Sequence, residues 1–384
     1  MIRKKLAHFD YTLVLLVVCM VIIGIVAIGS ANRINTLDIG FNKEFMSSEF
    51  MSQIIWFIIG IVCMLFVAFI DYRFICKFYI PIYIFNLILL FLVLSPLGTE
   101  INNVKRWIFG IQPSEFCKIF MIIFIATFID KHKEDINELK TLFILAILTL
   151  IPVVLIKAQP SLSASLVIFA ILAVELFIGN LDFKYIKIVL IILVPIIVIL
   201  AIDVLSGKYF FLDLFLKDYQ LDRIKSIVNF DLNTTDSSLY QTKNSAWAIG
   251  SGQLMGKGLF NGSMNQLNYI PYSHNDFIFA VIGEEFGFVG ACIIILLALL
   301  IISKCLLIAK KSIDNLGTLI VSGVVGMLAF QIFVNIGVAS SLLPNTGMPF
   351  PFLSAGGSSM LVNMASIGLV LNVAMTKPKN LFEK

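Results

Sequence analysis

The sequence is poor in charged residues and in histidine. Only 14% of its 384 residues are Asp, Glu, Lys or Arg, whereas 59% are hydrophobic. A soluble domain carries about 25% charged residues, so this composition excludes an ordinary soluble protein and indicates a polytopic membrane protein. The three histidines, His8, His132 and His274, are too few and too scattered along the chain to build a histidine-rich metal site.

Several other signatures are missing. The six cysteines have no C-x-x-C spacing and fall within or beside apolar stretches, so we expect neither disulfides nor metal ligation by cysteine. No phosphate-binding P-loop, dinucleotide fingerprint or Ser-His-Asp arrangement occurs. The net charge of +4 comes without a basic patch interleaved with aromatics, which argues against nucleic acid as a partner. We therefore predict no cofactor. A divalent cation stays open as an alternative, although no cluster of ligand residues supports one.

Long apolar stretches recur along the whole chain. About 20 apolar residues in a helix cross roughly 30 Å of hydrocarbon, which predicts an all-α membrane protein of about ten transmembrane helices in a single domain of residues 1–384. The first stretch is too long for a signal-peptide core and lacks a clear A-x-A cleavage site, so we keep it as a helix. The predicted spans lie near residues 11–31, 51–70, 78–95, 115–130, 141–157, 162–179, 185–205, 277–302, 316–342 and 353–375.

The distribution of Lys and Arg predicts the orientation. When the N-terminus is placed in the cytoplasm, most Lys and Arg residues of the short loops fall on the cytoplasmic side, as the positive-inside rule requires. Both termini are then cytoplasmic. The segment 206–275 becomes a large outer loop between helices seven and eight, and it is too long to influence the orientation.

Two segments interrupt the pattern of short loops. In the outer loop, residues 209–230 have apolar side chains at helical spacing, which fits an amphipathic helix on the membrane surface or an ordinary covering loop. Residues 240–262 are rich in Gly and small side chains, and a long outer loop of this kind is typically functional. The second segment, 343–359, has three prolines and three glycines and cannot form a continuous helix. Either it lines a site at membrane depth, or it is an ordinary loop.

Charged residues inside or beside the predicted spans need a reason, because burying them in a membrane is costly. Glu115 and Lys118 stand three apart in the fourth helix and can form an ion pair, structural or functional. Asp276 opens the eighth helix above a stripe of small residues. Glu284 follows about 12 Å further along that helix, too far for a carboxylate dyad. The candidates are Arg106, Glu115, Lys118, Glu175, Asp276, Glu284 and Glu285.

Of these candidates, Glu284 and Glu285 fit a structural role in helix packing, and Asp276 remains the candidate for chemistry. His274 stands two residues before Asp276. We expect this histidine to orient its neighbours rather than to carry protons or bind a metal.

Five stretches of the sequence are distinctive: KRWIFGIQPSEFCKI (105–119), AQPSLSASLVI (158–168), YQTKNSAWAIGSGQLMGKGLFNG (240–262), PYSHNDFIFAVIGEEFGFVG (271–290) and NTGMPFPFLSAGGSS (345–359). At these stretches the sequence resembles the RodA/FtsW/SpoVE family of shape, elongation, division and sporulation (SEDS) proteins. The order of the motifs, the ten spans and the outer loop also match, so the resemblance covers nearly the whole chain. Short tails and the sequence PYSHNDFIFAVIGEE favour a RodA-like member.

The resemblance implies an inverting glycosyltransferase of the bacterial cytoplasmic membrane. Its substrate would be lipid II, an undecaprenyl diphosphate that carries a disaccharide-pentapeptide. Asp276 matches the family's aspartate and would act as the base. A glycosyl diphosphate already has a good leaving group, so a single carboxylate suffices. The residues expected to bind substrate are Arg106, Trp107, Gln112, Glu115, Lys118, Lys243, Lys257, His274, Gly356, Gly357, Ser358 and Ser359.

The chain departs from the family pattern in two places. The family usually reads P-E-x-H-T-D, whereas Tyr272 here replaces the Glu and Asn275 the Thr. It also usually reads Q-P-D-x-G-T, whereas Ser161 replaces the Asp and Ser163 the Gly. Two outer carboxylates are therefore missing, which argues against a mechanism that needs them to hold a metal.

Two rival functions remain open: a flippase that moves the same lipid without chemistry, and a scaffold for a transpeptidase. The resemblance also implies a partner, a single-span class B penicillin-binding protein. We expect its membrane helix to dock on small residues such as the stripe of Gly323, Gly326 and Ala329, unless that stripe packs within the bundle.

Overall fold

The computed structural model describes residues 9–32, 48–101, 104–207, 237–267 and 269–376. The amphipathic helix predicted for residues 209–230 lies outside these ranges. Within them the regular secondary structure is helical apart from one short hairpin, which confirms the all-α fold class. The ten helices of at least 16 residues in these ranges are α2 (Tyr11–Ala31), α3 (Ser48–Phe69), α5 (Tyr79–Leu94), α6 (Pro113–Lys131), α7 (Leu139–Ala158), α8 (Leu162–Ile178), α9 (Phe183–Leu205), α14 (Ile278–Lys310), α15 (Asn315–Ala339) and α16 (Gly357–Met375).

These ten helices coincide with the ten predicted apolar stretches. Seven of them are long and apolar enough to cross a membrane, and α5 and α8 are shorter apolar helices. The chain is a multi-pass membrane protein. The observed helices differ from the predicted spans mainly toward the C-terminus: α14 continues to Lys310 rather than ending near residue 302, and α16 begins at Gly357 rather than near residue 353. Pro349 and Pro351 lack the backbone N–H that a helix needs, so the chain stays irregular before Gly357.

Shorter elements complete the fold. Strand β1 (Thr99–Ile101) pairs antiparallel with β2 (Val104–Trp107), and Glu100 stands opposite Lys105. Helix α4 (Tyr72–Lys77) follows α3. The segment predicted as a large outer loop contains two helices, α12 (Ser237–Ser251) and α13 (Ser263–Gln266), and α12 packs against α14.

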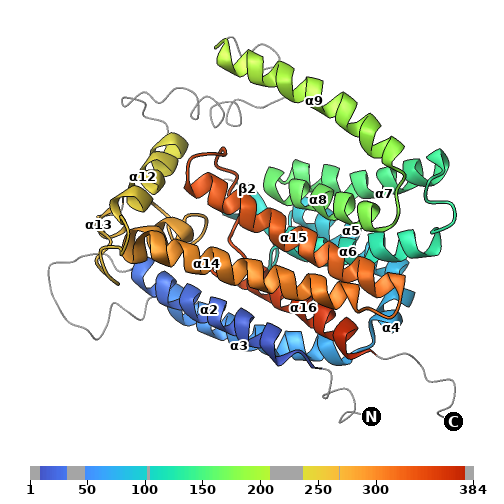
Figure 1. Cartoon of the computed structure of the whole chain (residues 1–384), viewed down its shortest axis with the longest axis horizontal. Helices are drawn as coiled ribbons and strands as arrows, with labels where there is room; N and C mark the ends of the chain where they lie inside the picture. Colours follow the sequence, from blue (N-terminus) through green and yellow to red (C-terminus); the bar gives the residue numbers. More distant parts are fainter. Residues whose placement is uncertain (1–8, 33–47, 102–103, 208–236, 268, 377–384) are drawn as a thin grey trace.

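Helices α15 and α16 form the centre of the bundle. In their most apolar 18-residue stretches 72% and 89% of residues are buried, against 17% in α3, which places α3 at the periphery. Helix α16 packs along α3, and α15 packs against α6, α8 and α14. Helix α9 is drawn apart from the other helices at the upper edge of Figure 1, and its most apolar stretch is not buried.

The glycine stripe of α15 packs inside this bundle. A Cβ added at Gly323 would stand 2.0 Å from Oε1 of Glu175, and one added at Gly326 would stand 3.0 Å from a methyl carbon of Val174. Both contacts are to α8. The expectation that a partner's membrane helix docks on this stripe is therefore wrong, because α8 already occupies it.

The bundle has two chemically different ends. At one end, the start of α2 and the ends of α14 and α16 meet around Asp10, Lys304, Lys311 and Ala374. At the other end, which is the end where α14 begins, lie the β hairpin and the irregular segment before Gly357. This second end contains the candidate site.

Candidate active site

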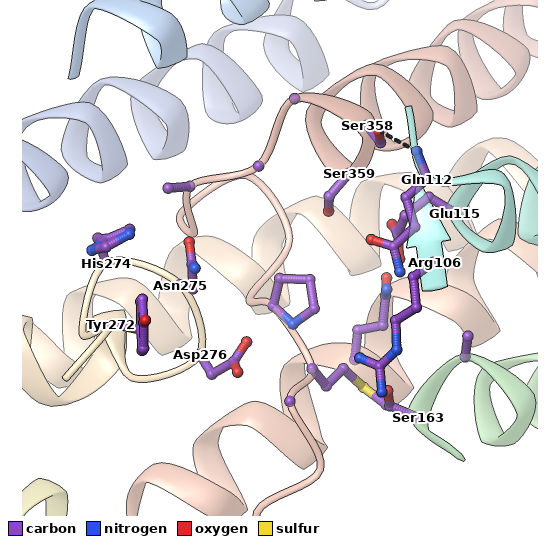
Figure 2. A pocket seen from close by; sticks show the side chains of 18 of the residues that line it. Arg106, Gln112, Glu115, Ser163, Tyr272, His274, Asn275, Asp276, Ser358 and Ser359 are labelled. Atoms are coloured by element: carbon purple, nitrogen blue, oxygen red, sulfur yellow. Dashed lines mark hydrogen bonds between the residues drawn. The ribbon is translucent and has the colours of Figure 1, made fainter. Parts of the chain in front are cut away.

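A cavity of about 690 Å³ lies at the end of the bundle where α14 begins. Its wall is formed by the starts of α3, α6, α8, α12 and α16, by one residue of α15, by β2, by the turn before α14, and by parts of the segment 347–357. Segments far apart in the sequence thus meet at one place (Figure 2). The predicted site residues that line it are Arg106, Trp107, Gln112, Glu115, Lys118, His274, Asp276, Gly356, Gly357, Ser358 and Ser359.

Four helices, α3, α6, α8 and α16, begin at this cavity, and the N-caps of the last three line it. These N-caps are Gln112 for α6, Ser161 for α8 and Gly356 for α16, and none of them has a side chain that accepts a hydrogen bond from a backbone N–H of its own helix. The first N–H groups of a helix have no partner within it, and they carry roughly half a positive charge. Three helix starts therefore make this wall attractive to an anion.

Asp276 lies in the turn before α14, and not within the helix as predicted, because Phe277 is the N-cap. Its backbone carbonyl accepts a hydrogen bond of 2.9 Å from Nδ2 of Asn335. The half-buried side chain lines the cavity. Figure 2 shows its carboxylate directed into the space that separates it from Arg106 and Glu115.

Arg106 faces the cavity from β2. Its Nε donates to the carbonyl of Gln159 at 3.2 Å, and Nη2 donates to the carbonyl of Pro160. These bonds hold the guanidinium at the junction of α7 and α8, which places a cation beside the N-terminus of α8. Trp107, the next residue, also lines the cavity.

The predicted ion pair in α6 is confirmed. Nζ of Lys118 stands 2.6 Å from Oε2 of Glu115, and both side chains are almost fully buried. Beside this pair, the backbone N–H of Gln112 donates to Oγ of Ser358 at 3.0 Å, which ties the start of α6 to the start of α16. The two helix starts are thus fixed relative to each other.

The other two lysines predicted to bind substrate, Lys243 and Lys257, do not line the cavity. Lys257 pairs with the buried Glu284 at 2.6 Å, and Oγ of Ser263 accepts from the same ammonium group at 2.7 Å. Lys243 is buried in α12. Glu284 and Glu285 are also buried away from the cavity, in agreement with the structural role predicted for them.

Comparison with known proteins identifies the family. The model of the FtsW, RodA and SpoVE family, described as "Cell cycle protein", matches residues 11–379. A probable peptidoglycan glycosyltransferase FtsW of Trichlorobacter lovleyi is 32% identical over 379 residues, 96% of this chain and 94% of the relative. The peptidoglycan glycosyltransferase MrdB of Escherichia coli is 32% identical over 370 residues, 95% of this chain and 93% of the relative. The chain belongs to the FtsW/RodA/SpoVE family.

Solved structures are similar to this chain over most of its length. The chain is similar to one chain of a peptidoglycan synthase complex, with a TM-score of 0.75 and 27% identity, over 95% of this chain and 97% of that one. It is also similar to the rod shape determining protein RodA of Thermus thermophilus, with a TM-score of 0.66 and 26% identity, over 95% of this chain and 96% of that one. Relatives also include stage V sporulation protein E of Bacillus subtilis, so the narrower RodA-like assignment stays a prediction.

The departures from the FtsW/RodA/SpoVE pattern also lie at the cavity. Tyr272 and Asn275 stand on the same turn as Asp276, and Ser163 stands at the start of α8 (Figure 2). Ser161 is the N-cap of α8 and also lines the cavity. Tyr272 is mostly exposed and has a left-handed backbone, with φ of 57°. In the part of the chain that the structure describes, no three His, Cys, Asp or Glu side chains gather closely enough to hold a metal ion.

Burial lowers the pKa of His274, with the negative charge of Glu49 acting weakly in the opposite direction. Its backbone carbonyl accepts from the N–H of Ala355 at 2.9 Å, which ties the turn before α14 to the segment before α16. This contact does not involve the imidazole, so the orienting role of the His274 side chain stays a prediction.

Sequence reasoning missed several residues of the wall, among them Glu49, Gln53, Trp56 and Gln331. Gln53 and Gln331 are uncharged polar residues within apolar spans. Such residues are a signal for a site, but the candidates predicted within the spans were the charged residues only. Gln53 is buried and donates to the carbonyl of Ser354 at 3.3 Å, while its Oε1 accepts from the N–H of Gly356 at 3.1 Å. It therefore shapes the start of α16.

Trp56 packs against that same helix start. A Cβ added at Gly357 would stand 2.3 Å from the Trp56 indole ring, so this position accepts only glycine at the present spacing. The indole and the first turn of α16 thus form one continuous part of the wall.

Proposed function

We propose that this chain polymerises lipid II into glycan strands at the outer face of the bacterial cytoplasmic membrane. The observation that carries the proposal is the carboxylate of Asp276, which faces a wall made of Arg106 and three helix starts across one cavity. Glu49 and Glu115 also line this cavity, and Glu115 is paired with Lys118. Membership of the FtsW/RodA/SpoVE family supports a glycosyltransferase, because its curated relatives include peptidoglycan glycosyltransferases.

The reaction needs a base and an anion-binding wall. An acceptor sugar hydroxyl attacks the anomeric carbon of the donor sugar, and its proton passes to Asp276. The new C–O bond forms as the bond to the diphosphate breaks, and the diphosphate leaves with the electron pair. Attack from the face opposite the leaving group inverts the anomeric carbon.

The departing diphosphate gains negative charge, and fixed positive groups stabilise that charge best when they need no rearrangement. Arg106 meets this requirement, because two backbone carbonyls hold its guanidinium in place. The N–H groups at the starts of α6, α8 and α16 supplement it. Lys118 adds a buried cation whose charge is offset by Glu115.

Two tryptophans suit the sugars of this substrate. Trp56 and Trp107 both line the cavity, one on α3 and the other on β2. Indole rings offer apolar faces with a polar N–H, a combination that accommodates the mixed apolar and hydroxylated surface of a pyranose.

The charge of the two bundle ends supports an outer site. Lys304 and Lys311 lie together at the end remote from the cavity. The positive-inside rule assigns a lysine-rich end to the cytoplasm. The cavity and Asp276 would then face outward, where the growing glycan is required.

A turnover experiment separates this proposal from its rivals. The purified chain would be reconstituted in liposomes with labelled lipid II, and both glycan polymer and movement of lipid II between leaflets would be measured. Polymer is expected. Movement of lipid II without polymer would support a flippase instead. If neither polymer nor movement were observed, the result would favour a scaffold function.

We further propose a class B penicillin-binding protein as the partner that cross-links the glycan. The similarity to one chain of a peptidoglycan synthase complex supports this pairing. Co-purification and assay of the pair should give several-fold more polymer than the chain alone. Full activity of the chain alone, unaffected by any transpeptidase, would contradict the coupling.

We propose elongation as the cellular role, because the sequence around Asp276 is RodA-like. Depletion of the protein should then give rounded cells. Filamentous cells would indicate a role in division.

A further inference from the structure

Gln331 is a buried amide in the wall of the cavity. It belongs to α15, its side chain is 1% exposed, and it lines the cavity below the turn that carries Asp276. Asn335, which bonds to the backbone of Asp276, follows four residues later on the same helix face. Gln331 therefore lies one helical turn, about 6 Å, deeper than the contact that holds the proposed base.

The side-chain oxygen of Gln331 has no hydrogen-bond partner among the residues that the structure describes. Buried polar atoms are nearly always paired with protein or with ordered water. An unpaired acceptor in a cavity wall is therefore one that water fills in the empty site and that a ligand group can take over. The other three glutamines of the cavity differ in this respect. Each of them makes at least one side-chain hydrogen bond within the protein: Gln53 with Ser354 and Gly356, Gln112 with Ser114, and Gln241 with Asn345.

The chemistry of an amide narrows the class of ligand. Its two ends are one donor group and one acceptor, and it carries no charge. A phosphate is better served by Arg106 and the helix starts. A secondary amide on the ligand offers one N–H and one C=O, so it can pair with both ends of Gln331. This match holds whichever way the Gln331 amide is turned.

We propose that Gln331 recognises the acetamido group of an N-acetylated sugar in the substrate. This inference rests on the proposed glycosyltransferase function, since it names a specificity residue of the same cavity. A site built to pair a buried polar group rejects the analogue that lacks the matching group, because its own group is then left unpaired. A sugar with a free amine would also bring a positive charge toward Arg106 and Lys118.

Binding of three lipid-linked disaccharides tests the assignment. They are lipid II itself and two analogues, each with a free amine in place of the acetamido group on one of the two sugars. The wild-type chain should bind one analogue at least roughly 10-fold more weakly than lipid II. In Gln331→Leu this ratio should fall to near one, mainly through weaker binding of lipid II. Gln331→Met provides a second variant of similar size.

Gln241→Leu is the matched control, because Gln241 lines the same cavity but already bonds to Asn345. This control should keep the wild-type discrimination ratio. Equal loss of affinity for all three lipids in both Gln331 variants would overturn the assignment, as would an unchanged ratio. Polymer formation is measured in parallel. A wild-type chain that discriminates between the lipids but forms no polymer would refute the proposed function and leave the recognition role intact.

Discussion

The side-chain amide of Asn335 holds the backbone of Asp276 in place. Its Nδ2 donates to the carbonyl oxygen of Asp276 at 2.9 Å and to that of Met348 at 2.8 Å. One residue of α15 thus joins the turn before α14 to the irregular segment before α16. Asn335 itself is buried outside the cavity lining, so it would act on the chemistry through the position of Asp276.

Replacing Asn335 by Leu should therefore slow polymerisation more than it weakens substrate binding. The two carbonyls lose their donor, and a displacement of about 1 Å at a reacting group can cost roughly 100-fold in rate. We expect kcat to fall by roughly 10- to 100-fold with KM changed by less than about threefold. Steady-state kinetics with lipid II would measure both.

Asn86→Leu is the matched control for this variant. Asn86 is fully buried, donates to Sγ of Cys117 at 3.2 Å and does not line the cavity. Both substitutions should lower the melting temperature, but only the change at position 335 should lower kcat. Equal loss of kcat in the two variants would mean that Asn335 has no specific role in positioning Asp276.

Arg106→Ala should reduce lipid II turnover by roughly 10-fold or more, because charge-assisted hydrogen bonds to phosphate are among the stronger ones. Arg106→Lys should recover only part of the loss, since the planar fork of the guanidinium is missing. Lys105→Ala is the control, because Lys105 is exposed on the same strand and does not line the cavity. Equal effects at positions 105 and 106 would indicate a general electrostatic effect of the membrane surface.

The pH dependence should not depend on His274. Burial lowers its pKa below the usual 6.5, so the imidazole loses its proton below that pH and is neutral at pH 7. His274→Gln should keep activity within about threefold and leave the acid limb of the pH–rate profile unchanged, since Asp276 is the proposed base. Disappearance of that limb in the variant would instead make His274 the proton acceptor.

The orientation can be tested at the two ends of α6. Phe109, before the helix, is 88% exposed, and Asp135, after it, is also exposed. In a cysteine-free background, an impermeant thiol reagent added outside intact cells or spheroplasts should label Phe109→Cys and miss Asp135→Cys. The reverse pattern would place Asp276 on the cytoplasmic side.

Local sequence signals predicted most of the architecture. The ten helices coincide with the apolar stretches of the sequence, and seven of them are long and apolar enough to cross the hydrocarbon of a membrane. The break in helix before Gly357 follows from the prolines and glycines of residues 343–359, and the Glu115–Lys118 pair follows from the spacing of three within one helix. Each of these features depends on residues close together in the chain.

Features that depend on distant residues were not predictable in this way. Helix α14 is interrupted at Gly287, where φ is 66°, and the N–H of Phe288 bonds to the carbonyl of Gln253. Nothing in the apolar run around Gly287 indicates this kink, because it depends on a segment more than 30 residues earlier. Likewise, Lys257 was assigned to substrate from its charge alone, whereas Glu284 binds it in the folded chain.

The most direct test of the account is polymerisation of lipid II by Asp276→Asn. The change keeps the size of the side chain and removes the proposed base, so polymer yield should fall by roughly 100-fold or more while lipid II still binds. Asp276→Glu, which keeps a carboxylate in a displaced position, should retain part of the activity. A normal polymer yield from a correctly folded Asp276→Asn protein would contradict the proposal that Asp276 is the base.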